Sequence, residues 1–126
     1  MKRSTILQPL SREHHTALTL AKACERAAKS GDGVLVRSTC QRVILAFSNE
    51  LEPHFKFEEQ SLLPLLHSTA TQALTERTLA DHQQLRGLLD ALRQNDAVAL
   101  ESFGKCLSDH VRFEERELFP VLETLL

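Results

Sequence analysis

Residues 54–66 read HFKFEEQSLLPLL, and residues 110–122 repeat this pattern as HVRFEERELFPVL. Phe47 and Phe103, upstream of the two copies, correspond at the same offset. In each copy a His precedes a Glu by four residues, a spacing that stacks both side chains on one face of a helix. The repeat therefore indicates two similar helical hairpins, each of which supplies a His and a Glu from its second helix.

Apolar residues elsewhere recur at intervals of three and four, which is typical of amphipathic helices. The pattern predicts helices over residues 11–29, 35–66, 72–94 and 97–123. Ser11 is the predicted N-cap of the first helix, and Asn95 with Asp96 caps the last. Pro53 falls inside the second helix, and we favour a kinked continuous helix over two separate ones because the apolar stripe keeps its phase. Short connections make neighbouring helices antiparallel, so the predicted fold is an all-α, up-down-up-down four-helix bundle.

The composition narrows the class of protein. A chain of 126 residues predicts one domain over residues 1–126. The net charge is −2 and no basic stripe occurs, which argues against nucleic acid as a partner. No apolar run approaches the ~20 residues that span a bilayer, so no membrane association is expected. The N-terminus is not followed by an apolar signal core, which predicts a cytoplasmic protein. The three widely spaced cysteines form neither a disulfide framework nor a paired-cysteine metal motif.

Polar residues interrupt the apolar stripe of every predicted helix. A lone His on such a face is usually a hydrogen-bonded core residue. Here four His and two Glu share the buried faces, and an unpaired buried carboxylate costs several kcal/mol. A metal centre would remove this cost, because the side chains become ligands and the cation offsets the charge. The candidate ligands are His14, His54, Glu58, His82, His110 and Glu114.

The positions of the four His along the bundle agree with one site. Counted from the turns between the helices, neighbouring His residues lie at heights that match to within about 6 Å, at ~1.5 Å of rise per residue. Two His and one Glu from each half suit a pair of metals bridged by both carboxylates. Imidazole and carboxylate without thiolate favour two non-haem iron ions, with manganese or zinc less favoured. Haem would leave both Glu residues unexplained.

With these residues in place, the chain resembles the hemerythrin-like (HHE) family over essentially its whole length. The doubled H-x-x-x-E-E-x-x-L-x-P pattern and the single His on each of the other two helices carry the resemblance. It implies a non-haem di-iron centre inside a four-helix bundle, with the six residues above as ligands. The oxygen-carrying hemerythrins have a second His four residues after the third-helix His, where this chain has Arg86. The chain is therefore similar to a four-His, two-Glu subtype that includes iron-centre repair proteins and iron-sensing domains.

Three further residues adjoin the candidate ligands. His15 lies beside His14 but falls about 100° round the helix, so we favour His14 as the ligand and place His15 at the rim. Glu59 and Glu115 each follow a candidate ligand Glu, and Glu115 occupies the position five residues after the last His, where the oxygen carriers have their carboxylate. Both are either solvated surface residues, supports for the ligands or alternative ligands.

The sequence supports several functions. The first is a di-iron protein that binds or responds to O2, NO or peroxide, in sensing, storage or detoxification. The second is a di-iron oxidoreductase that acts on NO or peroxide or in iron-centre repair, and the sequence leaves open whether the chain is an enzyme. The third is an iron-regulated interaction module, so a redox or regulatory protein partner also stays open. The remaining interpretation is a helical bundle with a buried polar network and no metal.

Overall fold

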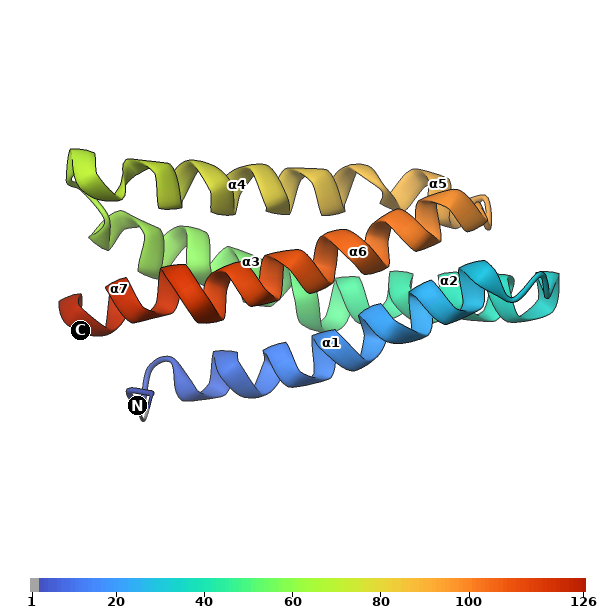
Figure 1. Ribbon diagram of the computed structural model, residues 1–126, viewed down its shortest axis with the longest axis horizontal. Helices are drawn as coiled ribbons and strands as arrows, with labels where there is room; N and C mark the ends of the chain where they lie inside the picture. The colour runs from blue at the N-terminus through green and yellow to red at the C-terminus, as the bar shows by residue number, and fades with distance from the viewer. Residues whose placement is uncertain (1–2) are drawn as a thin grey trace.

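The computed structural model describes residues 3–126, and these residues form only helices, turns and short connections. The α-helices are α1 (Gln8–Lys29), α2 (Gly33–Ala46), α3 (Glu52–Phe57), α4 (Gln72–Gly87), α5 (Leu89–Arg93), α6 (Ala97–Phe113) and α7 (Phe119–Leu125). Three π turns lie at Phe47–Leu51, Glu58–Leu62 and Glu114–Leu118, and two short 3₁₀ helices at Leu63–Leu65 and Thr69–Thr71. These segments join end to end into four antiparallel rods (Figure 1). The first rod is α1, the second runs from α2 to the 3₁₀ helix at Leu63–Leu65, the third is α4 with α5, and the fourth is α6 with α7. Both chain termini lie at one end of the bundle. The predicted four-helix bundle is confirmed.

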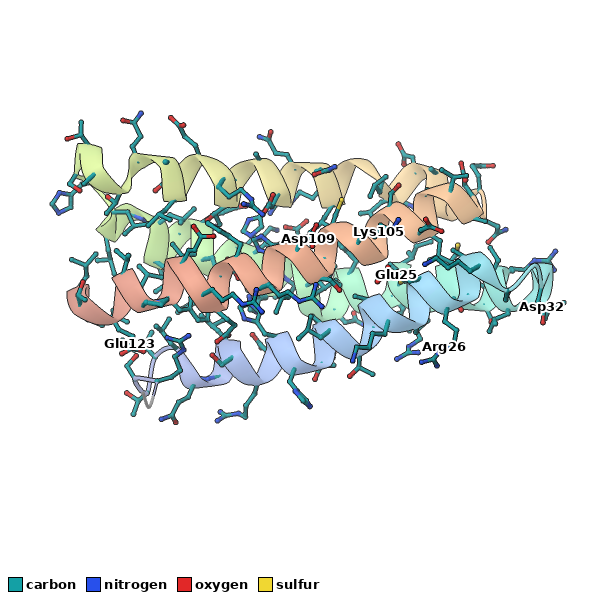
Figure 2. The ribbon with its side chains drawn as sticks, viewed as in Figure 1. Glu25, Arg26, Asp32, Lys105, Asp109 and Glu123 are labelled. Carbon is teal, nitrogen blue, oxygen red and sulfur yellow. The ribbon has the colours of Figure 1, made fainter. Side chains whose placement is uncertain are left out.

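Two aspartates begin rods at the end of the bundle opposite the chain termini. Asp32 accepts hydrogen bonds from the backbone N–H groups of Val34 and Leu35, and Figure 2 shows it in the turn between α1 and α2. Asp96 accepts in the same way from Val98 and Ala99, as predicted for the start of the last rod. In both cases the side chain satisfies N–H groups that the first helical turn leaves without a partner.

The first rod starts earlier than predicted. Helix α1 begins at Gln8, and the Ser4 carbonyl already accepts a hydrogen bond from the Gln8 N–H group at 2.9 Å. The Ser4 hydroxyl accepts from the Leu7 N–H group at 3.3 Å in the turn before α1, and Ser11, the predicted N-cap, lies inside the helix. Pro9 fits the first helical turn because it lacks an N–H group that would have no partner there. The Ser11 hydroxyl instead donates to Glu115 at 2.9 Å.

Each π turn ends two residues before a proline. A proline ring collides with the carbonyl four residues earlier in an α-helix, and it removes one backbone hydrogen bond. The chain responds by hydrogen bonding over five residues, as between the Glu52 N–H group and the Phe47 carbonyl just before Pro53. The second rod therefore continues as helix through Pro53, as favoured from the sequence. The sequence analysis did not predict the π turns, two of which begin at Glu58 and Glu114.

The apolar core divides into two clusters along the bundle. The larger lies toward the α1–α2 turn and includes Ala17, and the smaller lies toward the chain termini and includes Leu10. His14 lies between these two residues on α1. The layer of candidate His and Glu ligands, called the polar layer below, therefore separates the two apolar clusters. Helices α1 and α6 approach closely at Gly104. A side-chain carbon at this position would lie only 2.7 Å from the Ala21 carbonyl oxygen, so the close approach requires glycine there.

None of the helices described in residues 3–126 combines the length and the apolar character that crossing a membrane would require.

Candidate metal centre

The six candidate ligands come together in the polar layer, from all four rods. One site His comes from each of α1, α3, α4 and α6, and one Glu is the first residue of each of the π turns Glu58–Leu62 and Glu114–Leu118. The six residues are His14, His54, His82, His110, Glu58 and Glu114. All six side chains are buried. The ring centroids of His14 and His54 are 5.0 Å apart, and those of His82 and His110 are 4.9 Å apart. The predicted common height of the four imidazoles is therefore confirmed.

Each carboxylate lies between imidazoles from different rods. The Oε1 atom of Glu58 is 3.0 Å from Nε2 of His82, and its Oε2 atom is 3.1 Å from Nε2 of His54. The Oε1 atom of Glu114 is 2.7 Å from Nε2 of His14, and its Oε2 atom is 3.3 Å from Nε2 of His110. All four Nε2 atoms therefore face carboxylate oxygens in the interior of the bundle.

These atoms form two overlapping sets of four donors. One set joins His14 and His54 to Glu58 and Glu114, and the other joins His82 and His110 to the same two carboxylates. Within each set the donor atoms lie within 4.8 Å of one another. Two cations held this way would share both carboxylates, which is the arrangement that the repeat predicts.

Two buried atoms in the layer lack a hydrogen bond and indicate that the residues fit a cation. Nε2 of His110 and Oε2 of Glu114 face each other at 3.3 Å but make no hydrogen bond with acceptable geometry. An unsatisfied pair of this kind is costly in a protein interior. A cation between a neutral imidazole nitrogen and a carboxylate oxygen would satisfy both atoms.

The pKa values of Glu58 and Glu114 shift in opposite directions although both carboxylates are buried among imidazoles. Burial and the neighbouring Glu114 raise the pKa of Glu58 well above its usual value. Burial also opposes ionisation of Glu114, but the imidazoles of His110, His14 and His54 outweigh it and hold the Glu114 pKa well below its usual value. One ionised carboxylate is thus balanced by imidazoles, whereas the second requires a proton or a cation.

The pKa values of the imidazoles also shift in different directions. Burial lowers the pKa of His110, but Glu114 and Asp81 outweigh this effect and raise it to about 10. Burial and the neighbouring His110 lower the pKa of His82 to about 4. Hydrogen bonds to carboxylates likewise overcome burial and raise the pKa of His14 and of His54.

A second layer of carboxylates contacts the outer nitrogen of every imidazole. Nδ1 of His14 is 2.6 Å from Glu115, and Nδ1 of His82 is 2.7 Å from Glu59. The same contact occurs at 2.7 Å between His54 and Glu13, and at 2.9 Å between His110 and Asp81. An ionised carboxylate only accepts, so each of these Nδ1 atoms carries a proton, and once the ring is neutral its Nε2 atom has the lone pair that a cation would take.

The sequence analysis missed two members of this outer layer, Glu13 and Asp81. Each immediately precedes a site His, in the pairs Glu13-His14 and Asp81-His82. This acid-His pair is a partial signal, because it also occurs at Asp109-His110, where the Asp109 side chain is 72% exposed and pairs with Arg112. On a helix, however, the acid faces the His of a neighbouring rod rather than the His beside it.

Arginines hold three of the four outer carboxylates. Arg86 donates through Nη1 to Glu59 at 2.9 Å and through Nε to Glu52 at 3.0 Å. Arg77 donates to Asp81, and Arg3 donates to Glu115. Within residues 3–126, Glu13 has no arginine or lysine partner.

The structure also separates His14 from its neighbour. His14 lies in the polar layer with 4% of its surface exposed, whereas His15 is exposed and contacts none of the candidate ligands. The phase of the apolar stripe is therefore a correct guide to which His points inward, and the rim position expected for His15 agrees with its exposure.

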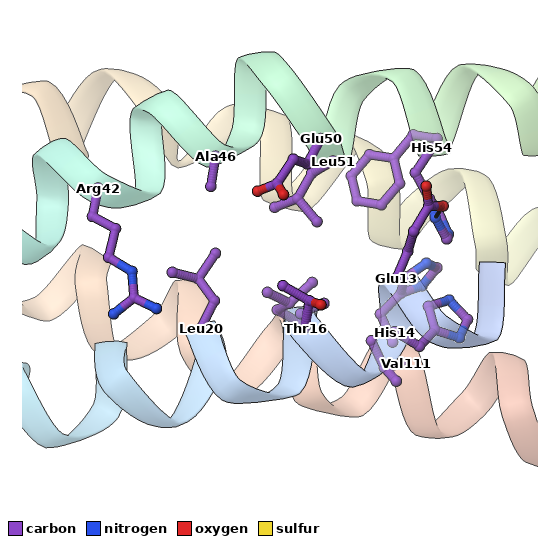
Figure 3. A pocket seen from close by; sticks show the side chains of 14 residues that line it. Glu13, His14, Thr16, Leu20, Arg42, Ala46, Glu50, Leu51, His54 and Val111 are labelled. Carbon is purple, nitrogen blue, oxygen red and sulfur yellow. Dashed lines mark hydrogen bonds and ion pairs between the residues drawn. The ribbon is translucent and has the colours of Figure 1, made fainter. Parts of the chain in front are cut away.

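A cavity of about 140 Å³ reaches the polar layer from one side, between α1 and the second rod (Figure 3). Its lining includes His14, His54 and His110 but not His82. The ring of Phe55 stacks against His82 at a centroid distance of 4.0 Å. Access to the candidate centre is thus unequal between its two halves.

Comparison with known proteins supports a cation site. The sequence pattern of the hemerythrin HHE cation-binding domain matches residues 5–122. Searches of curated proteins and of solved structures found no match. Because the matched range covers nearly the whole chain, the protein belongs to the hemerythrin HHE cation-binding domain family.

Proposed function

We propose that this protein holds two non-haem iron ions and binds or responds to O2, NO or peroxide through them. The observation that carries the proposal is that the two donor sets share Glu58 and Glu114. A single cation would leave the imidazoles of one set without a partner. Two cations bridged by both carboxylates use every inward-facing nitrogen of the layer.

The donor types support iron. Four imidazoles and two carboxylates without a thiolate suit iron, with manganese next, and six donors exceed what one tetrahedral zinc ion takes. Bound iron would supply one-electron chemistry and affinity for diatomic ligands. The protein residues hold the imidazoles in one tautomer through the outer carboxylates, and the apolar clusters on either side limit the access of water.

The donor set also supports the four-His, two-Glu subtype. Arg86 stands where the oxygen carriers have a fifth His, and its guanidinium pairs with Glu52 and Glu59 instead of entering the layer. Fewer protein ligands leave a coordination position for a small molecule or solvent. This arrangement favours sensing, storage or detoxification over reversible oxygen carriage.

The test is metal content together with an electronic spectrum, on protein from iron-supplemented cells that is then exposed to O2 and to NO. We expect two irons per chain and absorption bands that shift with each gas. The chain contains neither Trp nor Tyr, so the near-ultraviolet is clear for ligand-to-iron bands. His67→Ala is the matched control, because His67 is exposed at the end of the second rod and should leave both readings unchanged.

Two outcomes would overturn the proposal. Absence of iron, or one zinc with a silent spectrum, would contradict a di-iron centre. A di-iron spectrum that no gas or peroxide perturbs would contradict the response to small ligands and favour an iron-regulated interaction module. Steady turnover of NO or peroxide with a reductant would extend the proposal to an oxidoreductase.

A further inference from the structure

We propose that the cavity beside the centre binds a small monocarboxylate with an apolar body of about six to eight carbon atoms, whose carboxylate pairs with Arg42. The inference deepens the proposed function and rests on it for the chemistry at the inner end of the cavity. The binding itself depends on residues that lie outside the candidate ligand set.

The size of the cavity is the first support. Its volume of about 140 Å³ is close to the ~150 Å³ of an apolar cavity that accommodates benzene. A diatomic molecule needs only a fraction of that space. The cavity can therefore hold an organic molecule of benzene size rather than only O2 or NO.

The lining of the cavity indicates an apolar body for the ligand. Between its two ends the walls include two polar side chains, Thr16 and Glu50, and are otherwise largely aliphatic: Ala17, Leu20, Ala46, Leu51, Leu107 and Val111. Figure 3 shows Leu20 from α1 and Ala46 and Leu51 from the second rod on opposite sides of the cavity. A methylene chain or a phenyl ring would replace water against these side chains, which is favourable in proportion to the apolar area covered.

The charges along the cavity indicate where the carboxylate lies. Arg42, Ala46, Glu50 and His54 follow one another at intervals of four residues along one face of the second rod. Arg42 reaches toward α1 at the end farthest from the imidazoles (Figure 3). Among the ion pairs of residues 3–126 none involves Arg42, so its guanidinium is available to an anion.

The opposite end of the cavity disfavours a second negative charge. Glu13 lines it beside His54, and Glu50 lies between that end and Arg42, as Figure 3 shows. A ligand with one carboxylate at Arg42 and an uncharged end toward the imidazoles pairs its charge with the guanidinium and brings no charge near Glu13. A dicarboxylate of the same length would place its second charge against Glu13.

The experiment uses the metal-loaded full chain and 4-fluorophenylacetate as the probe, followed by fluorine NMR and calorimetric titration. The uncharged isostere 4-fluorophenylacetamide is the comparison ligand. We expect saturable binding of the acid, and binding of the amide that is weaker by about tenfold, because an Arg–carboxylate pair is a charge-assisted hydrogen bond.

Two pairs of variants locate the binding. Arg42→Gln should weaken the acid by about tenfold and leave the amide unchanged. Its control is Arg37→Gln, an exposed residue of α2 that does not line the cavity. Ala46→Phe should fill the cavity and abolish binding of both probes, whereas Leu45→Phe, at an exposed neighbouring position, should not.

Three results would overturn the inference: no saturable binding, equal affinity for acid and amide, or an Arg42→Gln variant that binds the acid as the parent does. The last result would mean that the carboxylate contacts the metal instead of Arg42. If these results occur in protein that holds two irons and responds to NO, the inference fails while the proposed function stands. If the probe binds as expected but the protein holds no iron, the proposed function fails instead.

Discussion

The two halves of the candidate centre contain the same donors but differ in what surrounds them. The half with His82 and His110 is the more closed, because Phe55 stacks on His82, only His110 of the two lines the cavity, and arginines hold both outer carboxylates. In the half with His14 and His54 both imidazoles line the cavity. There the outer carboxylate of His54, Glu13, has a side chain 55% exposed and no arginine or lysine partner within the described residues.

This difference separates the residues that supply the donors from the residues that control access to them. The repeat supplies donors at equivalent positions, so it determines that two similar sets form. Residues that differ between the halves, such as Arg86 and the small Ala46 beside the cavity, determine which set a small molecule can reach. We therefore expect the closed half to retain metal strongly and the open half to respond to ligands.

Replacing a shared carboxylate should have the largest effect, because it removes a donor from both halves. Glu58→Ala should reduce bound iron from two ions to fewer than one per chain and lower the melting temperature of the metal-loaded protein, since metal binding contributes to folding. In metal-free protein Glu58→Gln should raise stability, because burial disfavours the ionised Glu58. Elemental analysis and thermal unfolding measure both effects, and Glu117→Gln on the exposed surface is the control. A Glu58→Ala variant with two irons would show that the halves do not share this residue.

Acid should empty both halves, because ligation requires neutral imidazoles. In metal-free protein the pKa of His110 is raised to about 10, so its proton must leave before Nε2 can bind a cation. Metal uptake at pH 7 should therefore release protons, and affinity should increase as the pH rises toward 10. The stability of the metal-free fold depends on pH in the opposite direction. Protonated His110 stabilises that fold fully below pH ~6.5, and this contribution is lost as the pH rises through about 10. Titration in weakly buffered solution measures the protons, and metal retention unchanged down to pH 4 would contradict imidazole ligation.

Removing one imidazole should affect mainly one half. His14→Ala should leave about one iron per chain, held by His82, His110 and the shared carboxylates, and should reduce the response to NO, because the lost ion borders the cavity. His15→Ala is the adjacent control and should retain two irons, because His15 is exposed. The reverse outcome, in which His15→Ala empties the site and His14→Ala does not, would contradict the placement of α1.

The elements that the sequence predicts well are those with a strong period. The four rods and the inward face of His14 follow from spacings of three, four and 3.6 residues, and the common height of the imidazoles follows from counting residues from the turns. The predicted start at Ser11 was wrong by about one turn, because α1 begins at Gln8, where Pro9 fits the first turn and a turn held by the Ser4 carbonyl precedes the helix. The role of each residue as a metal ligand stays a prediction.

Other features depend on contacts between rods, which spacing within one rod does not reveal. Glu13 and Asp81 contact imidazoles 41 and 29 positions away in the chain, so no local pattern pairs them. The π turns arise where a proline displaces the hydrogen bonding of an α-helix, and a proline within a helix can also produce a kink or a break. The cavity is lined by small residues from two rods, such as Ala17 and Ala46, which are far apart in the chain.

Replacing Arg86, in the half with His82 and His110, should have a moderate effect on metal affinity. Arg86 fixes Glu59, which in turn holds the Nδ1 proton of His82. Arg86→Gln should weaken metal affinity by about tenfold, at the lower end of the effect of altering residues that orient ligands. Arg86→Lys should restore part of the affinity, because it keeps the charge but not the two-pronged contact with Glu52 and Glu59. Competition with a chelator measures the affinity, and equal values for Gln and the parent would show that Glu59 needs no support.

The smallest effect is expected at Glu13, and it distinguishes the two halves most directly when the same substitution is also made at Glu59. Glu59→Gln and Glu13→Gln both remove a carboxylate that lies 2.7 Å from the Nδ1 atom of an imidazole. Glu59 is half-buried and held by Arg86, so its loss should weaken metal binding by about 10- to 100-fold. Glu13 is exposed and solvent screens its charge, so its loss should cost only about two- to fivefold. Chelator competition on the two variants, side by side, checks this ratio. Equal losses would mean that both imidazoles depend on their carboxylates to the same degree, and that the open half differs from the closed half in access alone.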